Sequence, residues 1–307
     1  MTLLYAHAVS SRHQTPPGHP ERADRIAAVE RGLAGLSLTR RASPIAKESE
    51  LLRCHPQSYV DAIRDAEPET GTIQLDPDTW MSPGSWEAAL RAVGGACAAV
   101  DAVLAGEAKN AFVVARPPGH HAESATPMGF CLFGTVAIAA KHALDQHHLT
   151  RVAVVDFDVH HGNGTQVLLW DEPRALFATS QQMPLWPGTG DRSERGAHGQ
   201  IMNLPLPPRS DGATMRAAYE GEVFPALEAW RPELILISAG FDAHANDPLA
   251  QLNWREGDFA WLTQRLCDLA DTHAQGRVVS CLEGGYDLDA LAASVAAHVG
   301  VLQERGR

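Results

Sequence analysis

Apolar, β-branched runs alternate along this chain with segments whose apolar residues recur at three- and four-residue steps. The apolar runs predict strands at 2–6, 111–115, 151–156, 175–179, 201–204, 233–238 and 277–282. The helical spacing predicts helices that begin near 19–22 and end after 33, and at 50–62, 84–106, 135–148, 164–170, 214–230, 259–273 and 288–303. Pro225 is expected to kink or break the helix that contains it.

This alternation predicts an α/β protein in which helices cover both faces of a parallel sheet. The chain has no Pro/Ser-rich linker, internal repeat or low-complexity segment, so we expect a single domain over 1–307. Residues 67–83 are rich in Pro, Asp, Thr and Gly and lack a clear period, which predicts a long surface loop at the rim of a site. Ligands of such sheets bind beyond the carboxyl ends of the strands.

The composition is typical of a globular protein with excess negative charge. Hydrophobic residues make up 45% of the 307 residues, charged residues make up 20%, and the net charge is −12. No Lys/Arg cluster offsets that charge, which argues against a nucleic-acid partner. No apolar stretch approaches the ~20 residues of a membrane span. The first apolar run is also too short for a signal peptide, so we expect a cytoplasmic protein.

Scattered cysteines and histidines add little to this picture. The cysteines form no CxxC pair and indicate reduced thiols rather than disulfides or a cysteine zinc site; they are Cys54, Cys97, Cys131, Cys267 and Cys281. Isolated histidines are expected to pack or to lie at the surface; they are His7, His55, His142, His147, His148, His198, His273 and His298.

The segment 154–164, VVDFDVHHGNG, carries the densest chemistry. Its strand ends in Asp156, Asp158 and His160, whose side chains leave the backbone on one side. Unpaired buried charges cost several kcal/mol, and a divalent metal would supply the compensating charge. A single Asp or His would be explained by capping or packing, but this run favours a metal site. Asp242, directly after the most hydrophobic predicted strand, is the best candidate for a third ligand.

One His and two Asp form an oxygen-rich ligand set. This set fits Zn²⁺, and on ligand type alone Fe²⁺, Co²⁺ and Mn²⁺ stay open. Asp156 lies one residue pair deeper on the same strand face. We expect it to hold a histidine, or to bind a K⁺ or Na⁺ ion together with nearby groups such as Ser180.

Other polar loops also follow predicted strands. His120 and His121 come after Pro-Pro-Gly, and they form either a solvated pair or an acid/base pair beside the metal. The fixed conformation of a Pro/Gly loop favours the second interpretation. Tyr286 in the EGGY turn could donate its O–H to an oxyanion. Aromatic residues of two long loops, Phe130 after Gly129 and Trp186, could wall a narrow slot or simply extend the core.

Six motifs occur in a fixed order: RPPGHHA, GFC, DFDVHHGNGTQ, PGTG, SAGFDAHANDPL and LEGGYDL. They resemble the motif series of the zinc-dependent histone deacetylase / acetylpolyamine amidohydrolase superfamily. The resemblance extends at least from His19 to Tyr286. It implies the single-domain arginase/deacetylase fold, which has a central eight-stranded parallel sheet flanked by helices.

The resemblance also implies metal-assisted hydrolysis of an acetylated or otherwise acylated amine. In this superfamily the metal is zinc, and the resemblance implies that zinc activates a water molecule beside a histidine pair that transfers protons. The implied roles are metal binding by Asp158, His160 and Asp242; proton transfer by His120 and His121; polarisation of the amide carbonyl by Tyr286; and lining of the acyl-lysine channel by Gly129, Phe130, Trp186 and Leu249. The family more usually has Phe at the position of Trp186.

Two positions refine this interpretation. Asn163 stands where one branch of the family has Asp, as in the class II and bacterial pattern. We therefore expect His121, backed by Asn163, to stay the neutral base, while His120, backed by Asp156, carries more positive charge. Leu249 stands where polyamine-selective relatives have a glutamate, which favours acyl-lysine over a substrate with a second ammonium group.

Two segments depart from the family pattern. Residues 180–183 are expected to begin a long loop, at a place where relatives often carry a histidine. The expected acceptor for the substrate backbone, in the loop 76–82, has no clear motif, and Asp78 and Thr79 are the candidates.

Three function classes compete at this point. The first is the amidohydrolase, acting on acylated lysine peptides or proteins or on acylated small amines, including acetylpolyamines. The second is a binuclear ureohydrolase of the same fold, but DVHHG lacks the carboxylate two residues after the histidine. The third is a non-catalytic acyl-lysine binder, which the presence of Tyr286 and the histidine pair disfavours. Long rim loops leave a homo-oligomer open.

Overall fold

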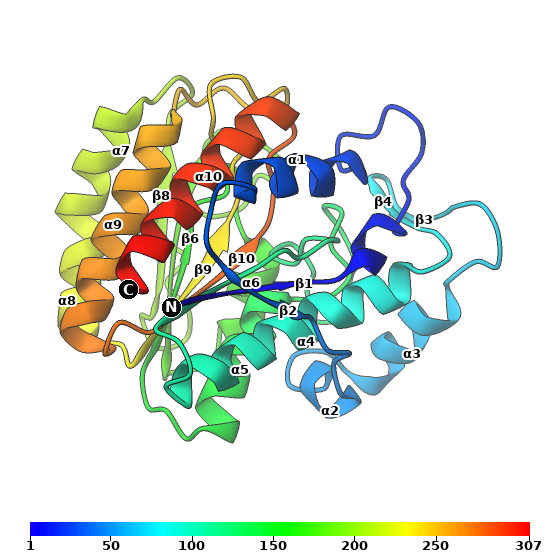
Figure 1. Ribbon diagram of the computed structural model, residues 1–307, viewed down its shortest axis with the longest axis horizontal. Helices are drawn as coiled ribbons and strands as arrows, with labels where there is room; N and C mark the ends of the chain where they lie inside the picture. Colours follow the sequence, from blue (N-terminus) through cyan, green and yellow to red (C-terminus); the bar gives the residue numbers. More distant parts are fainter.

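The computed structural model describes residues 1–307 and contains one eight-stranded sheet and a separate two-stranded hairpin. The strand order in the large sheet is β2-β1-β5-β10-β9-β6-β7-β8, and every pairing is parallel. Its strands are β1 (Thr2–Ala6), β2 (Thr39–Ala42), β5 (Asn110–Val113), β6 (Val152–Asp156), β7 (Ala175–Gln182), β8 (Ile201–Leu206), β9 (Leu234–Ala239) and β10 (Val278–Leu282). The α/β architecture expected above is confirmed (Figure 1).

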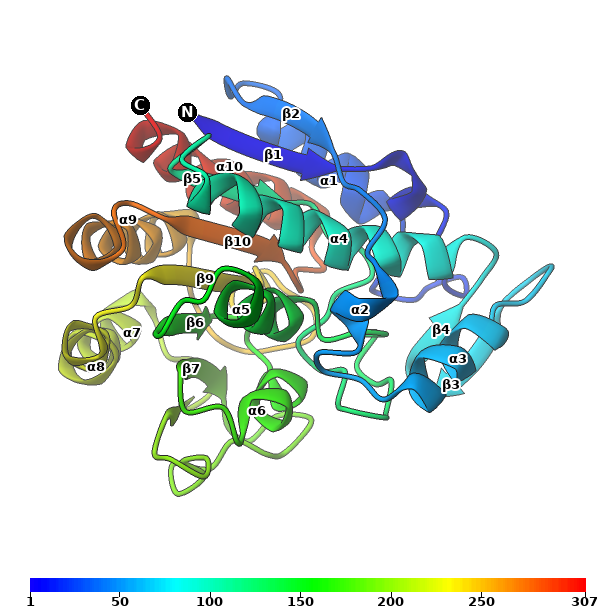
Figure 2. The same cartoon turned by 90° about the horizontal axis from the view of Figure 1, so that it is seen from below.

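Helices cover both faces of this sheet (Figure 2). Helices α4 and α5 lie over one face, while α1, α9 and α10 lie over the other. The helices are η1 (Ala8–Ser11), α1 (Asp24–Leu33), α2 (Glu48–Leu51), α3 (Gln57–Asp65), α4 (Ser85–Leu104), α5 (Thr135–Gln146), α6 (Asn163–Leu169), α7 (Gly212–Ala218), η2 (Tyr219–Val223), α8 (Phe224–Trp230), α9 (Glu256–His273) and α10 (Leu288–Arg305). None of them is long and apolar enough to cross a membrane.

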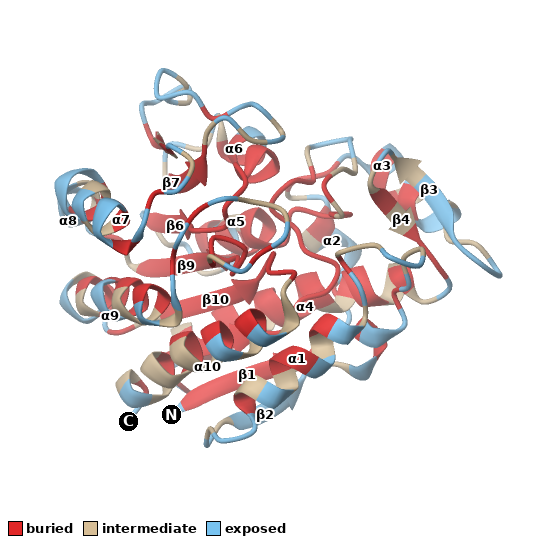
Figure 3. Ribbon diagram, turned by 90° about the horizontal axis from the view of Figure 1, so that it is seen from above, coloured by how far each residue is buried: buried red, intermediate tan, exposed pale blue.

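Alternation along the strands builds a separate core on each face of the sheet. In β6, Val152 and Val154 belong to the cluster under α4 and α5, and Ala153 and Val155 belong to the opposite cluster. The central strands are therefore apolar at every position and buried along their length (Figure 3). Each fully buried valine contributes about 1.5–3 kcal/mol relative to an exposed one.

The strand order also determines where the polar loops meet. Strands β5, β10, β9 and β6 are consecutive neighbours in the sheet. Because all of them are parallel, the loops that follow them leave from the same edge. The motifs that contain His120, Tyr286, Asp242 and Asp158 follow these four strands in that order. The fold thus brings together residues that are far apart in the sequence.

The eighth strand, β2, was not predicted from the pattern. Its residues, TRRA, are all exposed, and it lies at the end of the sheet beside β1 (Figure 3). An edge strand with little buried surface carries no apolar run, so hydrophobic periodicity does not reveal it.

Two predictions for the first 83 residues were wrong in detail. The helix expected over 50–62 is two helices, α2 and α3, with Pro56 at the N-cap of the second. The irregular loop expected over 67–83 contains an antiparallel hairpin, β3 (Ile73–Asp76) and β4 (Thr79–Met81). Its first strand is exposed or half-buried, so it too lacks an apolar signature.

One later segment agrees with the prediction and another differs. The helix expected over 214–230, with a kink or break at Pro225, is interrupted by a π-helical stretch at Tyr219–Val223, and Pro225 occupies the first turn of α8. Strand β7 continues to Gln182, through the segment expected to be a loop. There Gln181 donates to the carbonyl of Gly190 (2.8 Å), and Gln182 accepts from the backbone N–H of Gln251 (2.8 Å), so both glutamines anchor rim loops.

Candidate active site

Asp158, His160 and Asp242 converge beyond the ends of β6 and β9. His160 Nδ1 lies 3.2 Å from Asp158 Oδ1 and 3.1 Å from Asp242 Oδ2. All three residues are buried, and one ligand atom of each lies within 4.8 Å of the others. The sequence-predicted metal ligands therefore occupy one place in the fold.

Backbone groups fix the orientation of both carboxylates. The N–H of Gly284 donates to Asp158 Oδ2 and the N–H of Val159 donates to Asp242 Oδ1, both at 2.9 Å. Gly284 is required here, because a Cβ at this position would lie 2.2 Å from Asp242 Oδ2 and 2.6 Å from Asp158 Oδ2. The remaining oxygen atoms face His160.

The charges of this cluster fit a divalent metal. Burial, and then the neighbouring Asp158, raise the pKa of Asp242 to about 7. Burial lowers the pKa of His160, but its bonds to Asp158 and Asp242 outweigh burial and raise that pKa to about 10. Two adjacent buried carboxylates thus favour a positive charge between them. Two carboxylates and one imidazole form a suitable ligand set for Zn²⁺ or Fe²⁺.

His120 is paired with the carboxylate expected behind it. Its Nδ1 lies 3.0 Å from Asp156 Oδ2, and its Nε2 lies 3.7 Å from Asp158 Oδ1. Burial lowers the pKa of His120, but the charges of Asp158 and Asp156 outweigh burial, and the pKa lies well above its ordinary value. In this environment the imidazole is positively charged.

His121 has the opposite environment. Its Nδ1 lies 2.7 Å from the Asn163 side-chain oxygen, while the Asn163 amide donates to Glu123 (2.8 Å). Because the Asn163 oxygen faces the ring, His121 carries its proton on Nδ1 and keeps a lone pair on Nε2. Burial and the positive charges of His120 and His160 lower its pKa well below 6.5. His121 is therefore the neutral member of the pair.

Tyr286 follows β10 and is held from both sides. Its backbone N–H donates to Asp247 Oδ2 (2.7 Å), and the Arg25 guanidinium lies 5.0 Å from the centre of its ring. Arg25 also donates to the carbonyl of the preceding residue, Gly285 (2.8 Å). Burial, and then Asp242, raise the pKa of the Tyr286 hydroxyl well above 10, so the hydroxyl keeps its proton and can donate it.

Aromatic rings flank this group. Trp186 lies 4.7 Å from the ring of His121 and 6.2 Å from that of His160, and Phe130 lies 5.8 Å from the ring of Tyr286. Gly129 has a left-handed φ of +56°, and a Cβ there would lie 2.4 Å from the ring of His121. Gly129 therefore allows the loop to approach the histidine pair closely.

The turn of the β3–β4 hairpin supports the Phe130 loop. The N–H of Gly129 donates to Asp78 Oδ1 (3.1 Å), and the N–H of Phe130 donates to the Thr79 hydroxyl (3.0 Å). Thr79 is fully buried, whereas Asp78 is half-buried. Of the two candidates for binding a substrate backbone, only Asp78 is accessible.

Other predicted site residues lie apart from the centre. Leu249 lines a rim hollow of about 250 Å³ with Leu185. The Ser180 hydroxyl is bonded to the Tyr219 hydroxyl (2.8 Å), whereas Asp156 is bonded to His120. A shared cation site of Asp156 and Ser180 thus stays a prediction. His161, the neighbour of His160, is hydrogen-bonded to Thr189 (2.8 Å) and to Gln166 (3.0 Å) rather than to the predicted metal ligands.

Sequence reasoning missed the residues that hold the two catalytic loops in place. Glu283 accepts hydrogen bonds from the backbone N–H groups of Gly119 (2.7 Å) and His120 (3.2 Å). Glu21 bridges Arg116 (2.6 Å), before the histidine loop, and Arg25 (3.1 Å), behind Tyr286. The i,i+4 spacing of Glu21 and Arg25 was the one local signal for this network.

Comparisons with known proteins agree with this geometry. The family model described as histone deacetylase domain matches residues 19–302. A histone deacetylase-like amidohydrolase of Pseudomonas aeruginosa is 42% identical over 80% of this chain and 66% of its own length. The human polyamine deacetylase HDAC10 is 38% identical over 90% of this chain and 43% of its own length. The solved HDA15 HD domain superposes with a TM-score of 0.91 at 30% identity, covering 98% of this chain and 90% of that chain. The chain therefore belongs to the histone deacetylase family.

Proposed function

We propose that this protein is a zinc-dependent deacetylase that hydrolyses the amide bond of acylated lysine side chains. The observation that carries the proposal is the convergence, in one buried centre, of three metal ligands, one positively charged and one neutral histidine, and a tyrosine hydroxyl. Fe²⁺ would fit the same ligands. The family match supports a hydrolase of this type, and the metal and the substrate are the new elements.

The metal would be held by Asp158, His160 and Asp242. When bound, it supplies Lewis acidity and lowers the pKa of the attacking water. His121 accepts the proton of that water on its free Nε2, and its low pKa keeps it neutral at physiological pH. The same histidine then returns the proton to the leaving amine. His120, charged beside Asp156, stabilises the negative charge that develops during attack.

Tyr286 and the rim would orient the substrate. The Tyr286 hydroxyl donates a hydrogen bond to the oxyanion that forms from the amide carbonyl. Phe130 and Trp186 would hold the methylene groups of the lysine side chain between two aromatic rings. Asp78, which keeps one carboxylate oxygen free of the Gly129 bond, would accept an N–H from the substrate backbone.

We also propose that a K⁺ or Na⁺ ion lies near Asp156. The carboxylate is fully buried and shares its neighbourhood with Asp158, so this region carries more negative charge than His120 alone offsets. Nearby backbone carbonyls and the Ser180 hydroxyl, which keeps a lone pair beside its bond to Tyr219, would complete the ligands of this ion.

A polyamine substrate is the competing possibility, because one similar protein is named a polyamine deacetylase. Leu249 argues against it here, since it offers no charge to a second ammonium group. Its hollow is lined by Leu185 and prolines rather than by carboxylates.

The test is a substrate panel assayed with zinc-reconstituted protein. An acetyl-lysine peptide, the same peptide with a longer acyl group on the lysine, and N-acetylspermidine would be compared by kcat/KM. We expect the peptides to be preferred, and Leu249→Glu to raise kcat/KM for the polyamine by about 10-fold, as one added ion pair of about 1.4 kcal/mol would do. Preference of the unmodified protein for N-acetylspermidine would refute the acyl-lysine assignment. Inactivity on all three would refute the deacetylase.

A further inference from the structure

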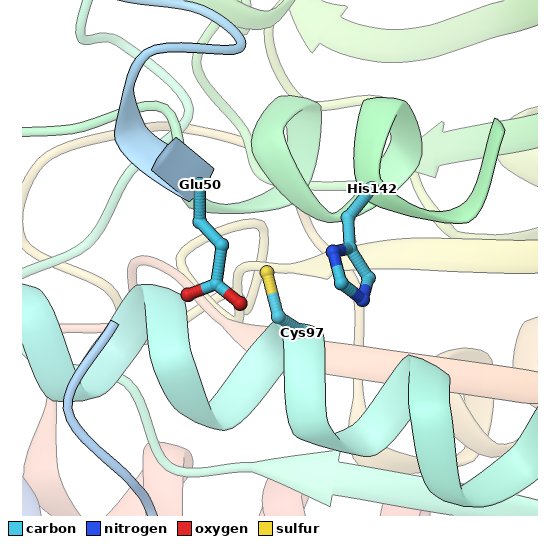
Figure 4. A group of neighbouring side chains, drawn as sticks. All are labelled: Glu50, Cys97 and His142. Atoms are coloured by element: carbon cyan, nitrogen blue, oxygen red, sulfur yellow. The ribbon is translucent and has the colours of Figure 1, made fainter. Parts of the chain in front are cut away.

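A second group of mixed ligands lies in the helical layer on one face of the sheet. Glu50 of α2, Cys97 of α4 and His142 of α5 point toward one another (Figure 4). One ligand atom of each lies within 4.8 Å of the others. Cys97 and His142 are buried and Glu50 is half-buried. None of the three takes part in the catalytic centre described above.

The tautomer of His142 is set by an acidic neighbour. Its Nε2 lies 2.6 Å from Asp101 Oδ1, so Nε2 carries the proton and donates it to the carboxylate. Nδ1 is then left with a lone pair. This atom is buried, has no hydrogen-bond partner and faces the Cys97 sulfur and the Glu50 carboxylate (Figure 4). A buried imidazole nitrogen without a partner is unfavourable, and a bound ion would give it one.

Glu50 and Cys97 also have free ligating atoms. Glu50 uses Oε2 to accept the N–H of Lys47 (2.7 Å), and no hydrogen bond engages its Oε1. The Cys97 thiol is not part of a disulfide. Two cations, Lys47 and Arg53, line the hollow beside this group, and Asp145 offsets the charge of Arg53 at 2.9 Å. The cluster therefore offers one sulfur, one nitrogen and one oxygen to a cation.

We propose that Glu50, Cys97 and His142 form a second metal site, for a zinc-type divalent ion held by Cys97 Sγ, His142 Nδ1 and Glu50 Oε1. A thiolate, an imidazole and a carboxylate are the side chains that zinc prefers. Asp101 orients the histidine through the hydrogen bond that commonly supports zinc-bound histidines. A polar hollow of about 310 Å³ is lined by Glu50 and His142, with Cys97 behind its wall, and would give the ion and a fourth ligand, water, a way in. Binding releases the thiol proton to solvent.

A neighbouring triad does not compete for this role. Asp101, His142 and His147 also lie within reach of one another. However, Asp101 Oδ1 lies only 2.6 Å from Nε2 of each histidine. Ligands of a tetrahedral zinc lie about 3.3 Å apart, so these distances fit hydrogen bonds rather than an ion. A neutral His142 has only one lone pair, and the Asp101 bond directs it toward Cys97.

Cobalt titration of the metal-free full-length chain tests the site. Thiolate-bound Co²⁺ absorbs in the near ultraviolet, and the Asp158–His160–Asp242 centre has no thiolate. We expect two Co²⁺ equivalents and this absorption band in the unmodified protein, and loss of the band and of one equivalent in Cys97→Ser. Cys267→Ser, at another buried free thiol in the opposite helical layer, is the matched control and should change neither result.

Two further variants protect the test against misfolding of Cys97→Ser. Glu50→Gln keeps an acceptor for the Lys47 N–H but removes the ligand charge, so it should weaken only the second equivalent. Asp101→Ala removes the acceptor that orients His142 and should weaken the second equivalent by about 10- to 100-fold. Binding of a single equivalent by the unmodified protein would overturn the proposal. A near-ultraviolet band that persists in Cys97→Ser would overturn it as well.

Discussion

The catalytic centre and the Glu50–Cys97–His142 cluster each gather three ligating side chains, but different parts of the fold assemble them. The catalytic ligands leave the ends of two adjacent parallel strands, and two of them lie two residues apart in the chain. The members of the second cluster come from three helices and are separated by more than 40 residues each. A sheet edge therefore displays its ligands as a motif, whereas helix packing joins residues that no local pattern connects.

The two groups also differ in how firmly they are held. Backbone N–H groups fix both catalytic carboxylates, and Gly284 leaves no space for a side chain beside them. In the second cluster, His142 is oriented by the one hydrogen bond that it donates to Asp101, and Glu50 lies on a single-turn helix at the surface. We therefore expect the catalytic centre to bind its ion more tightly and to lose it last during chelation.

Substituting one ligand in each group should give the largest effects, and each variant should affect a different measurement. Asp242→Asn should lower kcat/KM by about 10³-fold or more, since the metal supplies several kcal/mol of transition-state stabilisation. It should leave the near-ultraviolet cobalt band in place. Cys97→Ser should remove that band and keep kcat/KM within about two-fold of the unmodified protein. Parallel loss of both signals in either variant would mean that the groups are not independent.

Tyr286→Phe should have the next largest effect. Loss of one hydrogen-bond donor to an oxyanion lowers kcat by about 10²- to 10³-fold. Because the ring and its contact with Phe130 remain, KM should change little and both metal equivalents should bind. Steady-state kinetics with metal analysis would measure this. A fall in metal content instead of kcat would show that Tyr286 supports the centre structurally.

The acidic limb of the pH–rate profile is the third comparison. In the proposed mechanism His121 acts as a base only when neutral, so kcat/KM should fall as pH drops through its pKa, which burial and the charges of His120 and His160 lower below 6.5. Asn163→Asp would place a negative charge beside the ring, raise this pKa and move the acidic limb to higher pH. Glu123, which bonds Asn163, would repel the new carboxylate, so Asn163→Asp with Glu123→Gln is the sharper variant.

An acidic limb at the same pH in both variants would mean that a different group controls the profile. The Asn163→Ala variant serves as the control for lost contact, since it removes the bond to His121 without adding charge.

The smallest expected effect concerns stability. A metal in the second cluster ties α2 to α4 and α5, and a contribution of about 1 kcal/mol corresponds to roughly 2–4 °C in Tm for a chain of this size. Thermal unfolding of Asp242→Asn with and without zinc would measure the stabilisation by the second metal alone, without that of the catalytic metal. A zinc-dependent shift that persists after adding Glu50→Gln would assign the stabilisation to another site.

The parts of the fold that could be predicted are those buried on both sides. Val152–Val155 and 234–237 are apolar at every position because each face of the sheet meets helices. Strand β2 and the β3–β4 hairpin bury little, so their sequences carry no such pattern. The number of strands came from the motif resemblance rather than from hydrophobic periodicity.

The site shows the same limit. Asp158, His160 and Asp242 stand out because carboxylates follow apolar strands directly. Glu283 and Glu123 act through hydrogen bonds to loops 40 or more residues away, which sequence spacing does not encode. His142 was expected to be a packed or surface histidine, because its partners Asp101 and Cys97 lie on a different helix.

Strand β2 has a consequence for how copies of this protein meet. Its outer edge is the end of the sheet, and it carries two arginines that pair with acidic neighbours, Arg40 with Glu30 (2.7 Å) and Arg41 with Glu107 (2.7 Å). Charged side chains along a free edge discourage another strand from adding to it. The arginines thus prevent the unpaired backbone groups of this edge from pairing with a strand of another copy, which is the first step of aggregation. Replacing both arginines with valine would turn the same edge into a template for fibrils.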